Sequence, residues 1–167
     1  AEAEQAAQRA QRMRLGMQVA AAGGALLAAG LAAAVVSAVS FEAKMRQVAS
    51  IDDTVKNHFN SMSQSVLALA RELPQSANTL AAALYNIAGS GFYGAEALDI
   101  LEISAKAAAA GMTTTDNSAK AIVATLNAYG LGAESAARVS DALFNTVNYG
   151  VLSYEELTAA VSHFVGS

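Results

Sequence analysis

The sequence has no cysteine, no tryptophan and only one proline, and aromatic residues make up 6% of its 167 positions. Without cysteine there can be no disulfide bond, thiolate catalysis or cysteine-bound zinc. Sheets favour aromatic and β-branched side chains, whereas alanine, the commonest residue here, has the highest intrinsic helix propensity. The composition therefore predicts an all-α fold.

Positive charge is also scarce. Ten lysine and arginine residues stand against fourteen acidic ones, which gives a formal net charge of −4. Proteins that bind nucleic acid normally carry a basic face. We therefore expect no sequence-specific nucleic-acid partner.

The first forty residues have an unusual composition. Residues 1–14 are mostly alanine, glutamine, glutamate and arginine, with no large apolar side chain before Met13. The run from Leu15 to Phe41 contains no charged residue. A polar helix followed by an uncharged one suits a rod or a packing helix better than a globular core. We therefore assign residues 1–40 to one Ala/Gly-rich, rod-like or packing helix.

Within this segment, small residues recur at every fourth position and form a flat ridge on the predicted helix. A neighbouring ridge carries larger apolar side chains. Ridges of small residues allow a second helix to approach closely. The segment therefore predicts a homo-oligomer, and we assign the contact between copies to five residues: Gly16, Ala20, Gly24, Ala28 and Leu31.

A membrane role is the alternative for the same segment. The stretch Leu15–Val39 is long enough to cross about 30 Å of hydrocarbon as a helix. Much of it is alanine and glycine, which gain little from lipid. A secretory signal starting at Met13 is a weaker reading, because the apolar stretch exceeds a usual signal core. A membrane-inserting or pore-forming helical protein thus remains open.

After Phe41 the pattern changes to short amphipathic helices. Asp52-Asp53 is a candidate N-cap for a helix reaching Leu73, and Thr115 or Asp116 for a later one. Glycines end the predicted helices about every twenty residues, at Gly89, Gly111, Gly130 and Gly150. Such spacing favours a compact bundle of short antiparallel helices. We assign residues 41–167 to this second, helical domain.

One loop matches a cofactor-binding pattern. Residues 89–95 read Gly-Ser-Gly-Phe-Tyr-Gly-Ala, as in the G-x-G-x-x-G/A dinucleotide motif, and Asp116 lies at about the distance of a ribose-binding acid. That mechanism needs strands around the loop, whereas the preceding segment, Thr79–Ile87, reads as helix. The loop is therefore predicted to be a turn between helices.

Other candidates for chemistry are equally weak. His58 and His163 lie more than a hundred positions apart and belong to no metal-binding motif. The acid pairs Asp52-Asp53 and Glu155-Glu156 stand at predicted helix starts, where negative charge complements the helix dipole. We predict no catalytic residue, no metal, no cofactor and no enzymatic activity.

The residues after Phe41 resemble a known family. The phrase FEAKMRQV at residues 41–48 directly follows the Ala/Gly/Leu-rich segment, and LAAALYNIAGS occupies residues 80–90. Three further phrases follow in order at residues 119–130, 137–150 and 153–161: AKAIVATLNAYG, ARVSDALFNTVNYG and SYEELTAAV. In order and spacing they resemble the N-proximal helical region of phage tail tape-measure proteins, over about three-quarters of the chain.

This resemblance implies a structural role in a virion. Proteins of that family fill the tail tube, set tail length during assembly and leave ahead of the DNA at infection. The expected partners are other copies of the chain in the tail lumen, tail tube and tail tip proteins, and the host membrane at infection. The chain is much shorter than a complete tape measure and lacks its long heptad section.

Overall fold

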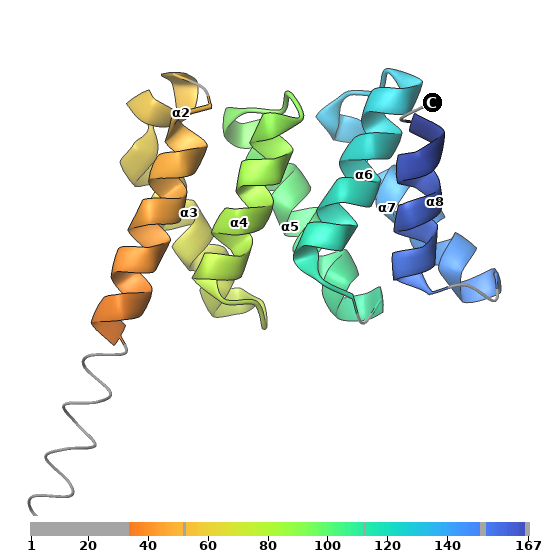
Figure 1. The fold of residues 1–167 in the computed structure, drawn as a ribbon, viewed down its shortest axis with the longest axis horizontal. Helices are drawn as coiled ribbons and strands as arrows, with labels where there is room; N and C mark the ends of the chain where they lie inside the picture. The colour runs from red at the N-terminus through yellow and green to blue at the C-terminus, as the bar shows by residue number, and fades with distance from the viewer. Residues whose placement is uncertain (1–33, 52, 112, 151–152, 166–167) are drawn as a thin grey trace, which may run out of the picture. The chain divides into compact units, whose positions relative to one another are not determined.

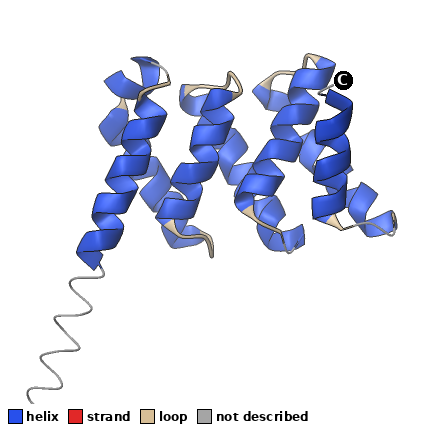
Figure 2. Ribbon diagram, viewed as in Figure 1, coloured by secondary structure: helices blue, strands red, loops and turns tan. Residues whose placement is uncertain are grey.

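A computed structural model of the protein describes residues 34–51, 53–111, 113–150 and 153–165. Residues 40–167 form one compact unit, and residues 1–39 belong to a separate unit that is described only from residue 34. All regular structure within these ranges is helical, so the all-α prediction is confirmed (Figure 2).

Short turns separate the helices (Figure 1). Residues 34–49 form the first described helix. The elements that follow are α2 (Asp53–Asn57), α3 (Phe59–Glu72), α4 (Ala77–Gly89), α5 (Gly94–Gly111), α6 (Thr115–Tyr129), the 3₁₀ turn η1 (Ala133–Ser135), α7 (Ala136–Tyr149) and α8 (Tyr154–Val165).

Side-chain caps explain where several helices begin. The Ser76 hydroxyl accepts a hydrogen bond from the backbone N–H of Thr79, at 3.1 Å, and so caps α4. At α8, the Ser153 backbone N–H donates to Glu156 Oε2 at 2.8 Å, and the Glu156 N–H donates back to Ser153 Oγ at 3.2 Å. This reciprocal pair is a capping box, which satisfies two backbone donors at once.

Two helix predictions are wrong in detail. The cap of α6 is Thr114, not Thr115 or Asp116, because Thr114 has the extended backbone that a cap needs and its hydroxyl accepts from the Asn117 N–H at 3.1 Å. The single helix expected from Asp53 to Leu73 is divided in two at His58, whose φ of −113° and ψ of 22° are not helical.

Gly130 ends α6 by a different means from the other glycines. Its φ of +61° lies in the left-handed region, which an L side chain rarely adopts. The next residue, Leu131, donates its N–H to the Leu126 carbonyl at 2.8 Å and so closes the helix end. Gly150 has φ −88° and ψ 142°, so it leaves α7 in extended backbone that any residue could adopt.

Within residues 40–167 the helices stack as hairpins in two layers (Figure 1). One layer contains α4, α6 and α8, and the other contains α3, α5 and α7; neighbours within each layer pack against one another. Consecutive helices also pack across the layers. The sequence predicted antiparallel helices with short connections. The structure shows in addition which helices are neighbours.

The core follows the 3.6-residue period of these helices. Helix α6 packs against α4, α5, α7 and α8, which makes it the centre of the stack. The largest side chains with less than 2% exposure are Met45, Val48, Val55, Val66, Leu80, Leu84, Ile87, Ile100, Leu101, Ile122 and Leu126. Between them lie buried alanines, which let the helices approach closely.

Candidate interaction sites

The dinucleotide-like loop is a turn between two helices. Helix α4 precedes it and α5 follows it, so no strand flanks the glycines. Gly91 and Gly94 have φ values of +99° and +59°, and this left-handed backbone is the local reason for glycine at both positions. The prediction of a helix-to-helix turn is therefore confirmed.

The histidine and acidic side chains of the described residues do not gather at one site. They contain no cluster of three or more histidine or acidic side chains that could hold a metal ion. His58 is exposed in the short link between α2 and α3, and the side chain of His163 lies outside the described part of the chain. A few polar side chains of the described residues instead join neighbouring hairpins.

The first such joint links α4 to α6. The amide of Asn86 donates a hydrogen bond to Asp116 Oδ1, and Lys120 pairs with Asp116 Oδ2 at 2.7 Å. Asp116 stands in the first turn of α6, where its charge also favours the helix dipole. The residue that resembled a ribose-binding acid thus holds one hairpin against the next.

A second joint lies at the other end of α6, but at the same C-terminal end of α4. Asn127, near the end of α6, donates from its side-chain amide to the Ser90 carbonyl at 3.2 Å. Ser90 belongs to the turn after α4 and donates its own hydroxyl hydrogen to the Asn86 carbonyl at 2.8 Å. The C-terminal end of α4 is therefore hydrogen-bonded to both ends of α6.

The third joint links the α5–α6 turn to α8. Thr113 Oγ1 donates to Glu155 Oε1 at 2.5 Å. This hydrogen bond is the main reason why the pKa of the Glu155 carboxyl lies below its ordinary value; the Glu155 backbone N–H and the Asn117 side chain act in the same direction. The acid pair Glu155-Glu156 therefore serves two structural purposes, a joint and a capping box.

Shallow grooves run between neighbouring helices of the second layer. The groove between α5 and α7 has a volume of about 310 Å³, and Ile103, Ala107 and Phe144 contribute to its lining. The groove between α3 and α5, about 290 Å³, is lined partly by Met62, Ala95 and Leu98. Lys106 and Asp141 also line the first groove, and His58 lines the second. The remaining lining is mostly small or apolar and offers surfaces for helix packing.

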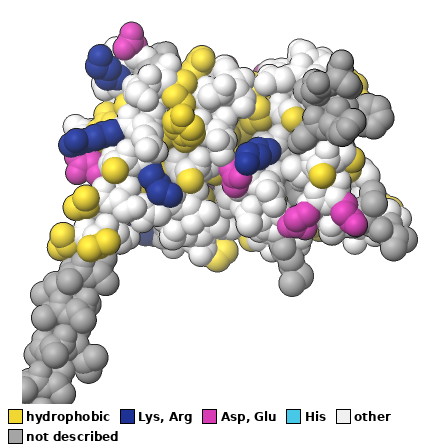
Figure 3. Space-filling model, in the orientation of Figure 1, with side chains coloured by type: hydrophobic (Ala, Val, Ile, Leu, Met, Phe, Trp, Pro, Cys, Tyr) yellow, Lys and Arg dark blue, Asp and Glu magenta, His cyan; other side chains and the backbone are white. Residues whose placement is uncertain are grey.

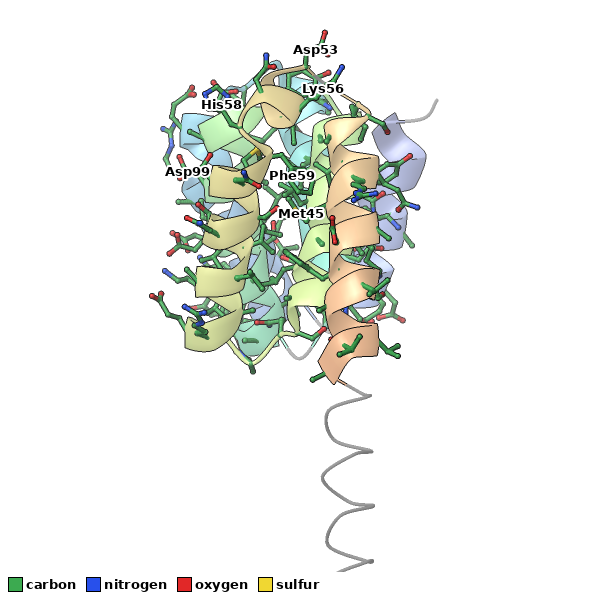
Figure 4. All side chains as sticks on the ribbon, turned by 90° about the vertical axis from the view of Figure 1, so that its left-hand side faces the viewer. Met45, Asp53, Lys56, His58, Phe59 and Asp99 are labelled. Atoms are coloured by element: carbon green, nitrogen blue, oxygen red, sulfur yellow. The ribbon has the colours of Figure 1, made fainter. Side chains whose placement is uncertain are left out.

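A larger depression lies at the first hairpin, where Figure 4 shows Met45 and Phe59 directed into the space between the first helix and α3. Its lining mixes charged and apolar residues, and its volume is about 600 Å³. Lys56 and Asp53 lie at its outer end, 3.8 Å apart between Lys56 Nζ and Asp53 Oδ1. Such an exposed pair contributes little to stability.

The visible surface carries little charge (Figure 3). Its hydrophobic side chains form separate patches and not one continuous band. Of the exposed large residues, Tyr149 and Tyr129 are the most open, at 86% and 77%, and both stand at helix ends. Tyrosine at such positions combines an apolar ring with a polar tip, which is typical of protein contact surfaces.

The whole predicted oligomer contact lies outside the described residues. This applies to Gly16, Ala20, Gly24, Ala28 and Leu31. The described end of the same uncharged segment carries three exposed valines, Val35, Val36 and Val39, each more than 60% exposed. None of the helices within the described ranges is both long and apolar enough to cross a membrane.

Comparison with known proteins gives two matches. The family model described as phage-related minor tail protein matches residues 63–167. A curated protein of Clostridium phage phiCD119, named "Probable tape measure protein", is 28% identical over 140 residues. That alignment covers 81% of this chain but 15% of the phage protein, so the chain spans a small part of its relative's length. No solved structure matches.

Proposed function

We propose that this chain, which belongs to the family of phage-related minor tail proteins, is part of a tape-measure protein that fills the tail tube. Membership of the family makes the chain a component of the phage tail, associated there with other tail proteins. The finer role has two parts. The protein sets tail length during assembly, and it leaves the tube ahead of the DNA at infection.

The observation that carries this proposal is the similarity to the probable tape measure protein over most of the chain. The physical character of the chain supports it. Helices of three to five turns, joined by short turns and by a few side-chain hydrogen bonds, can separate one hairpin at a time. A protein that must pass along a narrow tube needs this property more than it needs a rigid core.

We further propose that several copies pack together through the small residues Gly16, Ala20, Gly24 and Ala28 and the neighbouring Leu31. The exposed Val35 and Val39, four positions apart, would extend an apolar face on the adjoining helix. Tail tube and tail tip proteins are the proposed neighbours, and contact with the host membrane at infection stays a prediction. The role is structural, and we assign no catalytic activity to the chain.

Imaging of tails before and after DNA release tests the lumen part of this proposal. In the phage that encodes the chain, we expect density inside the tube of intact tails and an empty tube after ejection. An epitope tag on the chain should be protected in intact tails and appear in the released fraction. A tag that stays on the outer surface throughout would contradict the proposal.

A further inference from the structure

The α5–α6 hairpin is packed unevenly along its length. Its turn end consists of residues 104–111 and 115–121, and its far end of residues 94–103 and 122–129. At the far end the buried side chains are mainly large: Ala97, Ile100, Leu101, Ile122, Val123 and Leu126. At the turn end the buried residues are all small or hydroxyl-bearing: Ser104, Ala105, Ala107, Ala108, Thr115, Ser118, Ala119 and Ala121.

The hydroxyls at the turn end are buried without hydrogen-bond partners. Ser104 and Ser118 are 0% exposed and Thr115 is 1% exposed. No group in the described part of the chain bonds to Ser104 Oγ, Thr115 Oγ1 or Ser118 Oγ. Each such oxygen has lost its hydration on folding and regained nothing, which weakens the packing around it.

A glutamine adds a further unpaired atom at the same end. Gln75, just before α4, donates from Nε2 to the Ala105 carbonyl at 3.0 Å, so its side chain reaches the turn end of α5. Its Oε1 is buried and has no partner among the described groups. The Asn86–Asp116 hydrogen bond and the exposed Lys120–Asp116 ion pair also lie at this end, on its surface. Its interior combines little apolar burial with several unpaired polar atoms.

We propose that the turn end of the α5–α6 hairpin is a built-in opening point, which separates locally while the far end stays packed. Both causes act in one direction. An alanine contributes much less apolar surface than a leucine or isoleucine, and each unpaired buried oxygen lowers local stability further. The Thr113–Glu155 joint lies at the same turn, so local opening also breaks this hydrogen bond to α8.

Hydrogen–deuterium exchange of the complete 167-residue chain, followed by mass spectrometry of overlapping peptides, tests the proposal. After correction for intrinsic rates, amides of the turn end should exchange at least about tenfold faster than those of the far end. Equal protection at the two ends would overturn the proposal.

A double variant, Ser104→Ala with Ser118→Ala, tests the cause. Removing both unpaired oxygens should slow exchange at the turn end by about tenfold and leave the far end unchanged. Ser61→Ala is the control, because Ser61 is an exposed serine inside helix α3 whose Oγ already donates to the His58 carbonyl at 2.9 Å; it combines the helix propensity gain with the loss of a paired hydroxyl. Faster exchange in the double variant, or the same slowing in the control, would overturn the proposal.

These measurements use the isolated chain, so they are independent of the tape-measure role. Uniform protection of the hairpin amides would contradict the proposed opening point and would not affect the proposed function. A tail protein found outside the lumen would remove that function and leave the exchange pattern standing.

Discussion

The Leu126→Ala variant should lose about 3 kcal/mol of its free energy of unfolding, with a fall in Tm of about 10 °C. Leu126 is 0% exposed and lies on α6, the helix that packs against α4, α5, α7 and α8. Truncation removes its transfer free energy and leaves a cavity that rigid neighbours fill only in part. Urea unfolding followed by circular dichroism measures the change.

Leu131→Ala is the control for that variant. It makes the same chemical change five residues later, at a side chain that is 37% exposed beyond the end of α6. Its loss should stay below about 1 kcal/mol, because a partly exposed leucine leaves no sealed cavity. Equal losses in the two variants would contradict the placement of α6 at the centre of the stack.

The proposed ridge contact predicts that the unaltered chain is a discrete oligomer and that the Gly24→Leu variant is a helical monomer of 17.0 kDa. A leucine on the small-residue ridge holds the helices apart, and overpacking of this kind costs about 2 kcal/mol at each site. Every copy carries the change, so the costs accumulate across the assembly. Light scattering and circular dichroism on one sample give mass and helicity together.

Ala22→Leu is the matched variant beside it. Ala22 lies two residues before Gly24, and two residues on a helix turn the side chain by about 200°, to the face opposite the ridge. This variant should keep the oligomer mass of the unaltered chain. If Gly24→Leu also keeps that mass, the assignment of the contact to the ridge is wrong.

The sequence predicts the helices of this fold well, because each helix can be recognised from its own residues. Apolar residues recur with helical period, and a residue such as Ser76 or Gly130 marks an end through its own backbone preference. The errors are also local. Thr114, Thr115 and Asp116 are all acceptable caps by type, and the extended backbone that selects Thr114 is visible only in the folded chain.

The joints between hairpins could not be predicted in this way. Asn86 and Asp116 are 30 residues apart, and Thr113 and Glu155 are 42 apart. Neither pair forms a motif, and asparagine or threonine at a turn is usually explained by the turn itself. Only the stacking order of the helices brings each donor to its acceptor, so these contacts depend on tertiary structure alone.

The unpaired hydroxyls also could not be predicted from the sequence, because their burial depends on tertiary structure. A serine inside an alanine-rich helix, such as Ser104, reads from the sequence as neutral or solvent-facing. Its complete burial follows from the helices that pack around α5. Burial without a partner turns an ordinary residue into a determinant of local stability.

Tail length in the phage that encodes this chain tests the tape-measure role most directly. An in-frame insertion of about two heptads of helix-forming residues within residues 1–14 adds ~21 Å of helix. Electron microscopy of assembled tails should then show a mean tube length greater by about this amount, because the extended chain sets the length. Tails of unchanged length that contain the lengthened protein would contradict the role.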